Sequence, residues 1–290
     1  MRKTSTRIAM LLAALLIAVS AIAVSLLMGT MLSAPVLRHI GPPPPDLAAI
    51  EVNFDGVEGW FVAAHAGAPC MLLMHGVRGD RRSMIERARL LRRAGYSSLL
   101  FDFQAHGASP GRHITFGHLE SANARAGLAL LRSKFACAKV GAIGQSLGGA
   151  ASLLGEGPLR VDLLILESVY PTIEEAVADR LRIRLGSVGA LLAPVLTLQL
   201  KPLLGVDGSA LRPISRIGAY HGPLLIISGA EDQHTRQDET LRLYEAANQP
   251  KELWMVAGAA HVDLQRFAPE QYEARVLAFL TAHMPASVQP

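Results

Sequence analysis

The feature that most constrains this chain is the segment Gly144-Gln145-Ser146-Leu147-Gly148, which joins an apolar run at residues 140–144 to a helix-like run at residues 147–154. A short, continuous apolar run is typical of a buried strand in a parallel sheet. The pattern therefore predicts a sharp turn from strand to helix with Ser146 at its tip. Such a turn is strained, and bulky side chains two residues before or after the serine would clash. Glycine at both positions fits this prediction.

The rest of the chain repeats the same alternation. From residue 47 onward, strand-like and helix-like runs follow one another, which predicts an α/β fold with a mostly parallel sheet. We expect one domain over residues 47–290 that opens with a hairpin turned at Asp55-Gly56. The hairpin strands are predicted at 49–55 and 58–64, the further strands at 70–74, 96–101, 140–144, 161–166, 224–228 and 253–256, and the helices at 82–94, 121–135, 147–154, 173–185, 188–200 and 270–282.

A helical insertion at about residues 170–220 separates the strand at 161–166 from the strand at 224–228. Its position is the one where a cap or lid is expected. The stretch 191–198 is unusually apolar. It can either pack on the core or line an apolar pocket, and both interpretations stay open.

Residues 1–46 differ from the rest. No charged residue occurs between Ile8 and Val36, and an apolar run of 18 or more residues is long enough to cross a bilayer. The run is also longer than the apolar core of a signal peptide. Arg2, Lys3 and Arg7 precede it, which predicts a single-pass membrane anchor with the folded domain on the periplasmic or extracytoplasmic side. A proline-rich spacer follows at 41–45. Secretion after signal cleavage is the alternative.

The composition excludes several classes of protein. Half of the 290 residues are hydrophobic and the net charge is only +4, so the chain is not intrinsically disordered. Arginines gather between residues 78 and 93 without a nucleic-acid-binding motif, so we expect no nucleic-acid partner. Cys70 and Cys137 lack the spacing of a metal site. We expect two free thiols, although their strands could be neighbours and a disulfide is conceivable. The sequence does not indicate an oligomeric state.

A serine hydroxyl is a weak nucleophile, and it needs a base and a group that orients the base. With this kind of turn, the three residues follow the chain order serine, acid, histidine. Asp232 follows the predicted strand at 224–228, and His261 follows the one at 253–256. We therefore predict a triad of Ser146, Asp232 and His261. The other candidates are Glu231, Asp263 and Glu167 for the acid, and His234, which falls too early in the order, for the base.

The negative charge that develops on an attacked carbonyl oxygen needs backbone N–H donors. We predict that Leu147, directly after the serine, supplies one donor and Val77 the other. Gly76 should let the backbone of that loop approach closely. His75 is expected to be a structural residue of the loop rather than a catalyst.

Together with His75-Gly76, the segment 101–109 and Glu167-Ser168, these residues resemble α/β-hydrolases over roughly residues 48–284. They are most similar to a membrane-anchored, dienelactone-hydrolase-like or serine-aminopeptidase-like branch. The resemblance implies an α/β-hydrolase fold and a serine hydrolase that acts through an acyl-enzyme. It also implies carboxylic esters of small-molecule or lipid-like acyl groups as substrates, and neither a metal nor an organic cofactor.

Two alternatives remain at this point. A peptidase or amidase would use the same triad, and a membrane-tethered binding protein could keep the fold without turnover. The chain departs from common patterns of the superfamily at Gln145 and in its apolar insertion. Fold alone does not decide the substrate.

Overall fold

The structure is a computed structural model that describes residues 2–286, without the side chains of residues 2–9, 14, 17 and 18. Its centre is an eight-stranded sheet in the order β10-β9-β8-β7-β4-β5-β3-β2. Strands β2 and β3 form the predicted hairpin, β3 pairs antiparallel with β5, and the other pairings are parallel. The strands are β2 (Ile50–Phe54), β3 (Val57–Val62), β4 (Cys70–Met74), β5 (Ser97–Phe101), β7 (Val140–Gln145), β8 (Leu163–Glu167), β9 (Leu224–Gly229) and β10 (Lys251–Val256).

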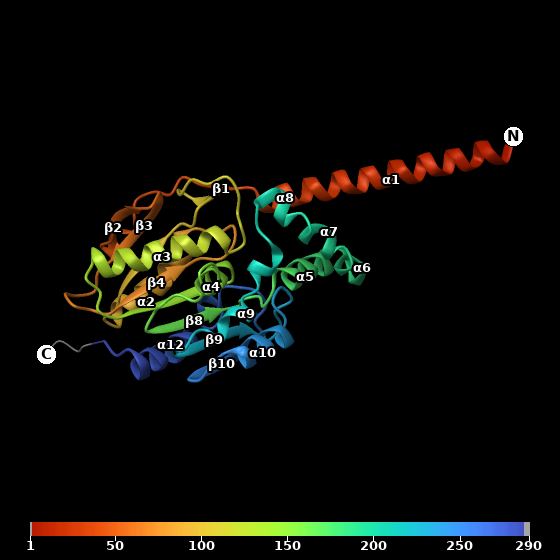
Figure 1. Cartoon of the computed structure of the whole chain (residues 1–290). Helices are drawn as coiled ribbons and strands as arrows, with labels where there is room; N and C mark the ends of the chain where they lie inside the picture. The colour runs from red at the N-terminus through yellow and green to blue at the C-terminus, as the bar shows by residue number, and fades with distance from the viewer. Residues whose placement is uncertain (1, 287–290) are drawn as a thin grey trace.

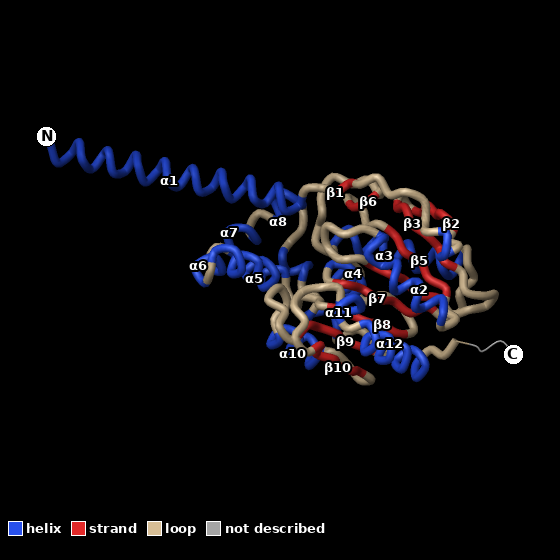
Figure 2. The backbone as a smooth tube through the Cα atoms, turned by 180° about the vertical axis from the view of Figure 1, so that it is seen from behind, coloured by secondary structure: helices blue, strands red, loops and turns tan. Residues whose placement is uncertain are grey.

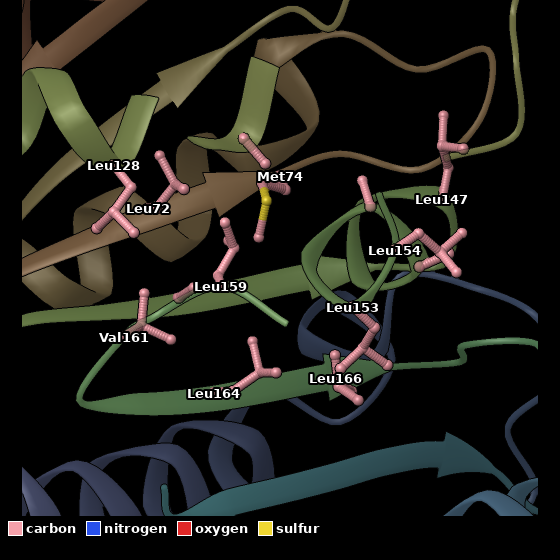
Figure 3. Packing of buried hydrophobic residues seen from close by; sticks show 14 of the residues in the cluster. Leu72, Met74, Leu128, Leu147, Leu153, Leu154, Leu159, Val161, Leu164 and Leu166 are labelled. Carbon is pink, nitrogen blue, oxygen red and sulfur yellow. The ribbon is translucent and has the colours of Figure 1, made fainter. Parts of the chain in front are cut away.

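Helices cover both faces of this sheet (Figures 1 and 2). Along β4, Leu72 and Met74 belong to one buried cluster, and Met71 and Leu73 belong to the other. Successive side chains of a strand point to opposite faces, so an entirely apolar strand supplies both clusters. Figure 3 shows the first cluster, where β4 and β8 meet the helices of one face. That face carries α3 (His118–Ser133), α4 (Leu147–Leu153) and α10 (Gln237–Ala246), and the other carries α2 (Ile85–Arg93) and α12 (Pro269–His283).

The predicted α/β fold is thus confirmed, with small shifts at the ends of elements. The hairpin turns at Asp55 and Gly56, which both have positive φ angles, 53° and 74°. Positive φ at both central residues is what a tight two-residue hairpin requires. Short elements complete this part of the chain: the 3-10 helices η1 (Pro45–Leu47) and η2 (Arg81–Met84), and the helix α11 (Leu264–Phe267).

The expectation of two free thiols is wrong. Cys70 and Cys137 form a disulfide with a Cα–Cα distance of 5.9 Å, inside the range that a bridge allows. Cys70 begins β4, and Val140 of the neighbouring β7 stands opposite it. The backbone N–H of Cys70 donates to the carbonyl oxygen of Lys139. This pairing brings the residues before β7 to the start of β4, where the second cysteine lies.

The insertion between β8 and β9 (residues 168–223) differs from its predicted form. Helix α5 (Ile173–Leu185) agrees with the prediction, but the helix predicted at 188–200 is broken into short pieces. Pro194 lies in the first turn of one of them, a position that proline tolerates because no N–H is needed there. The pieces are α6 (Ser187–Ala190), α7 (Ala193–Thr197) and α8 (Leu200–Leu204), followed by η3 (Gly208–Leu211) and α9 (Ile214–Ile217).

The N-terminal segment forms α1 (Arg2–Ser33), which extends away from the sheet (Figures 1 and 2). No helix within residues 2–286 is found to be long and apolar enough to cross a membrane. The predicted membrane anchor, and with it the predicted single-pass membrane localisation, is therefore wrong. The C-terminal part of α1 instead lies against α7 and α8, and Gln199 Nε2 donates a hydrogen bond to Ser25 Oγ.

A two-stranded parallel sheet, which the sequence did not predict, holds the chain just after α1. Strand β1 (Val36–Leu37) pairs with β6 (His106–Gly107) in the loop after β5. The backbone N–H of Ile114 also donates to the carbonyl oxygen of Ser33 at 2.8 Å. Two-residue strands have too short a pattern to be read from a sequence. These contacts tie the end of α1 to the loop at the carboxyl end of β5.

Candidate active site

Ser146 lies at the tip of a strained turn between β7 and α4. Its backbone has φ 48° and ψ −108°, a conformation that non-glycine residues seldom adopt and that is found mainly where function requires it. A Cβ on Gly144 would lie 2.5 Å from the backbone nitrogen of Gly149, and one on Gly148 would lie 2.3 Å from the carbonyl oxygen of Met74. Both glycines are therefore required by packing, as the motif predicts.

Asp232 and His261 are joined directly. His261 Nδ1 and Asp232 Oδ2 are 2.7 Å apart, and the other carboxylate oxygen of Asp232 accepts the backbone N–H groups of His234 and Thr235. Burial opposes the charge on Asp232, but the His261 ring and the two N–H donors outweigh it and lower the pKa of this carboxyl. The aspartate is therefore charged at neutral pH and holds the ring so that Nδ1 carries a proton.

The sheet order places these loops beside the serine. Strands β7, β8, β9 and β10 are adjacent and parallel, so their carboxyl ends share one edge of the sheet. The end of β8 connects the Ser146 turn to the loop that carries Asp232. Ser146 N–H donates to the carbonyl oxygen of Glu167, and Thr235 Oγ1 donates to the carbonyl oxygen of Ser168 at 3.3 Å.

The structure joins the acid to the base but not the base to the serine. Among the described residues, Ser146 Oγ forms no hydrogen bond with His261. Catalytic hydrogen bonds are often long in unliganded enzymes and shorten only when substrate binds. The triad therefore stays a prediction, supported by the position of its three members and by one hydrogen bond.

The alternative acids are engaged elsewhere or face solvent. Glu167 is fully buried and binds Arg87 through both carboxylate oxygens, at 3.0 and 2.6 Å, and it accepts the hydroxyl of Tyr272. Asp263 binds the same guanidinium at 3.1 Å, and Glu231 is exposed. These contacts leave Asp232 as the carboxylate that a histidine reaches.

His234 is adjacent to the pair but is not part of it. Its ring centroid lies 5.1 Å from that of His261, and it makes no contact with a carboxylate comparable to the one between His261 and Asp232. Burial, followed by the neighbouring His261, lowers the pKa of His234. It therefore lacks the acid partner that a catalytic base needs.

The loop after β4 lies against the serine. Val77 and Leu147, the two predicted oxyanion donors, line the same cavity as Ser146. A Cβ on Gly76 would lie 3.7 Å from the Ser146 Cβ, an ordinary contact, so close approach does not require glycine there. His75 is buried: Nδ1 contacts the carbonyl oxygen of Gly76 at 2.7 Å and Nε2 accepts the N–H of Phe103. Burial lowers the pKa of His75 to about 3, so the neutral ring connects two loops.

The cavity at Ser146 has a volume of about 130 Å³ and is open to solvent. Its walls are mostly apolar, and one of them is a face of α5. Residues spaced by three or four along that helix line it: Ile173, Ala176, Val177, Arg180, Leu181 and Arg184. The same helical spacing is present in the sequence. It predicts that these residues share one face of α5, and the position of Ser146 indicates that this face turns toward the nucleophile.

Three cations reach this cavity, namely Arg78, Arg180 and Arg184. Arg180 is half-buried, and its guanidinium donates to the carbonyl oxygen of Ala176 in its own helix. Within the described part of the chain, none of the three forms an ion pair with a carboxylate, whereas most other arginines do. The cavity therefore combines apolar walls with three arginines that form no direct ion pair. In residues 2–286 no group of three or more potential ligands is arranged to hold a metal ion.

Comparisons with known proteins agree with this fold. No model of a protein family matches the chain. It is 31% identical over 221 residues to the uncharacterized protein Rv2307c of Mycobacterium tuberculosis, covering 76% of this chain and 71% of that protein. It is 25% identical over 228 residues to the uncharacterized protein YqkD of Bacillus subtilis, covering 77% and 75% of the two chains.

Solved structures are similar over most of their length. The Pyrococcus furiosus esterase Pf2001 superposes with a TM-score of 0.70 at 24% identity, over 87% of this chain and 98% of that one. The alpha/beta hydrolase GrgF from Penicillium gives 0.59 at 18% identity, over 81% and 98%. The chain therefore has the α/β-hydrolase fold and belongs to the same family as the Mycobacterium tuberculosis protein Rv2307c.

Proposed function

We propose that this protein is a serine hydrolase that cleaves carboxylic esters, with Ser146 as nucleophile, His261 as base and Asp232 as orienting acid. The observation that carries the proposal is the 2.7 Å contact between His261 and Asp232 at the same sheet edge as the strained Ser146 turn. The similar structures include proteins described as esterases, which supports an ester as substrate.

The arrangement supports a two-step reaction. His261 Nε2 takes the proton of Ser146 as the hydroxyl oxygen attacks the carbonyl carbon, and the backbone N–H groups of Val77 and Leu147 bind the oxyanion. Collapse of this intermediate expels the alcohol, which receives the proton from His261, and leaves an acyl-serine. Water then attacks the acyl group with His261 again as base. Asp232 stabilises the protonated ring in both steps.

The cavity favours a particular kind of ester. The apolar walls from α5 would hold an acyl chain, in keeping with a lipid-like substrate, and the insertion between β8 and β9 would serve as the cap. Arg180 and its two neighbouring cations would bind an anionic group of the substrate, because a guanidinium without a carboxylate partner is available for one. We further place the protein in the dienelactone-hydrolase-like or serine-aminopeptidase-like branch. The resemblance of segment 101–109 supports this proposal, and the buried Asp102 of that segment accepts the N–H groups of Arg81 and Ala108.

Covalent labelling tests the proposal. A fluorophosphonate should label the wild-type protein, and p-nitrophenyl esters should be turned over faster than the matching p-nitroanilides. Ser146→Ala should abolish labelling, and His261→Ala should reduce it strongly. Ser215→Ala and His113→Ala, at exposed positions, are the matched controls and should behave as wild type. Labelling that survives Ser146→Ala, or turnover confined to the anilides, would overturn the proposal.

A further inference from the structure

One wall of the Ser146 cavity comes from outside the hydrolase domain. Met28 and Leu32, in the last two turns of α1, line this cavity together with Ser146 itself. The two residues are four apart, so they lie on one face of the helix. Ser25, Gly29 and Ser33 share this face, and it is the one that contacts the insertion.

The two faces of this part of α1 differ in exposure. Leu27 and Met31, beside the cavity-lining residues in sequence, are 58% and 63% exposed, and Leu32 is 38% exposed. Ser33 is buried, and Met28 and Gly29 are half-buried. A Cβ on Gly29 would lie 2.4 Å from Gln199 Oε1 and 3.0 Å from Leu203 Cδ1. The helix and the insertion therefore approach closely along this line, with little space for a larger residue.

The space continues beyond the serine between the same elements. A second, smaller cavity of about 40 Å³ lies between α1, α5, α7 and α8. Leu32, Phe116, Ile173, Val177 and Leu196 line both cavities. The two cavities are therefore adjacent and separated by apolar side chains, with Leu32 at the boundary. Ser146 and Leu32 line the same cavity, so an acyl chain attached to the serine would share this space with Leu32.

We infer that the end of α1 is the specificity wall of the acyl pocket, and that Leu32 and Met28 set the length of acyl chain that the enzyme accepts. The inference rests on the proposed ester hydrolysis at Ser146. The substrates it implies are esters of medium to long unbranched acyl groups. Each further methylene that the pocket buries should raise kcat/KM by about fourfold, until the chain meets the Leu32 side chain.

Chain-length profiling with p-nitrophenyl esters from acetate to palmitate tests the inference on the full chain. Leu32→Trp should shorten the preferred acyl chain, and Leu32→Ala or Met28→Ala should lengthen it. For each methylene lost or gained, the ratio of kcat/KM for long esters to kcat/KM for short esters should change about fourfold. Turnover of the acetate ester, measured on the same samples, is the reference for each ratio, because a short acyl group does not reach the wall. Leu27→Trp and Leu27→Ala, at an exposed position of the same turn that does not line the cavity, are the matched controls.

The outcomes separate this inference from the proposed function. If wild type hydrolyses the esters and Ser146→Ala does not, but the Leu32 and Met28 variants keep the wild-type profile, the wall assignment is wrong. An equal shift in the Leu27 variants would also overturn it, because the effect would then belong to the helix as a whole. Loss of Ser146-dependent hydrolysis in the wild type would refute the proposed function instead. Circular dichroism identifies any variant that is misfolded, and the enlarging and narrowing variants give independent tests.

Discussion

The assignment of Asp232 rather than Glu167 as the acid can be tested by exchanging the charge of each residue separately. Glu167→Gln should lower the free energy of unfolding and leave the rate of ester turnover unchanged. Arg87 is fully buried, and Glu167 holds it through two hydrogen bonds. Removing one partner of a buried ion pair costs about 3–5 kcal/mol. Asp263 still contacts Arg87, so we expect the free energy of unfolding to fall by about 3 kcal/mol, at the lower end of this range. With a denaturant slope near 3 kcal/mol/M, the urea midpoint should fall by about 1 M.

Asp232→Asn should do the opposite. The asparagine oxygen can still accept the N–H groups of His234 and Thr235, so the loop keeps its shape. Its amide, however, faces His261 Nδ1 and favours the tautomer that cannot accept the serine proton. In a triad this substitution lowers kcat about 10⁴-fold.

Urea unfolding followed by circular dichroism and turnover of one p-nitrophenyl ester measure the two effects on the same samples. Glu86→Gln is the matched control, because its carboxylate pairs with Arg89 at the surface, and it should change neither quantity. The reasoning is refuted if Glu167→Gln abolishes turnover at wild-type stability while Asp232→Asn stays active. The acid would then be the glutamate at the end of β8.

Three further predictions follow from other contacts. The disulfide closes 67 residues, and chain entropy for such a loop predicts that Cys70→Ala/Cys137→Ala loses about 4 kcal/mol in urea unfolding; coincident transitions of variant and wild type would contradict this. Burial, helped by Asp179, raises the pKa of Glu239 to about 8. Its contribution to stability is therefore complete below its ordinary pKa and is lost as the pH rises through about 8, so Glu239→Gln should raise the urea midpoint at about pH 9 and not at about pH 4. Arg180→Gln should lower kcat/KM for an ester that bears a carboxylate about tenfold relative to a neutral ester of equal length, whereas the exposed control Arg216→Gln should not; equal losses on both esters would show that Arg180 binds no anion.

Much of the site could be predicted from sequence because its signals are local. The glycines around Ser146 are required by contacts within the turn and with the adjacent β4, and Asp232 and His261 each follow a strand directly. The disulfide could not be predicted in this way, since it depends on β4 and β7 being neighbours. The contact between His261 and Asp232 likewise depends on the sheet order.

The contact between α1 and the insertion could not be predicted from the sequence for a different physical reason. Its described side chains are apolar on nearly every face, so no periodic pattern indicates which face meets another element. The contact is determined by small residues, Ser25 and Gly29, and by the pairing of β1 with β6 just beyond the helix. The break before α7 in the helix predicted at 188–200 has a simpler cause, Pro194, which lies in the first turn of α7.

The disulfide also determines what a cut in the chain would release. Cys70 and Cys137 enclose α2, β5, β6 and α3, including the exposed loops between them. A protease that cleaves one of these loops would produce two pieces that remain covalently linked and still share the pairing of β4 with β7. On a denaturing gel such a nicked protein would migrate as one species without reductant and as two fragments with it. Damage in this half of the molecule therefore need not separate the loop after β4 from Ser146.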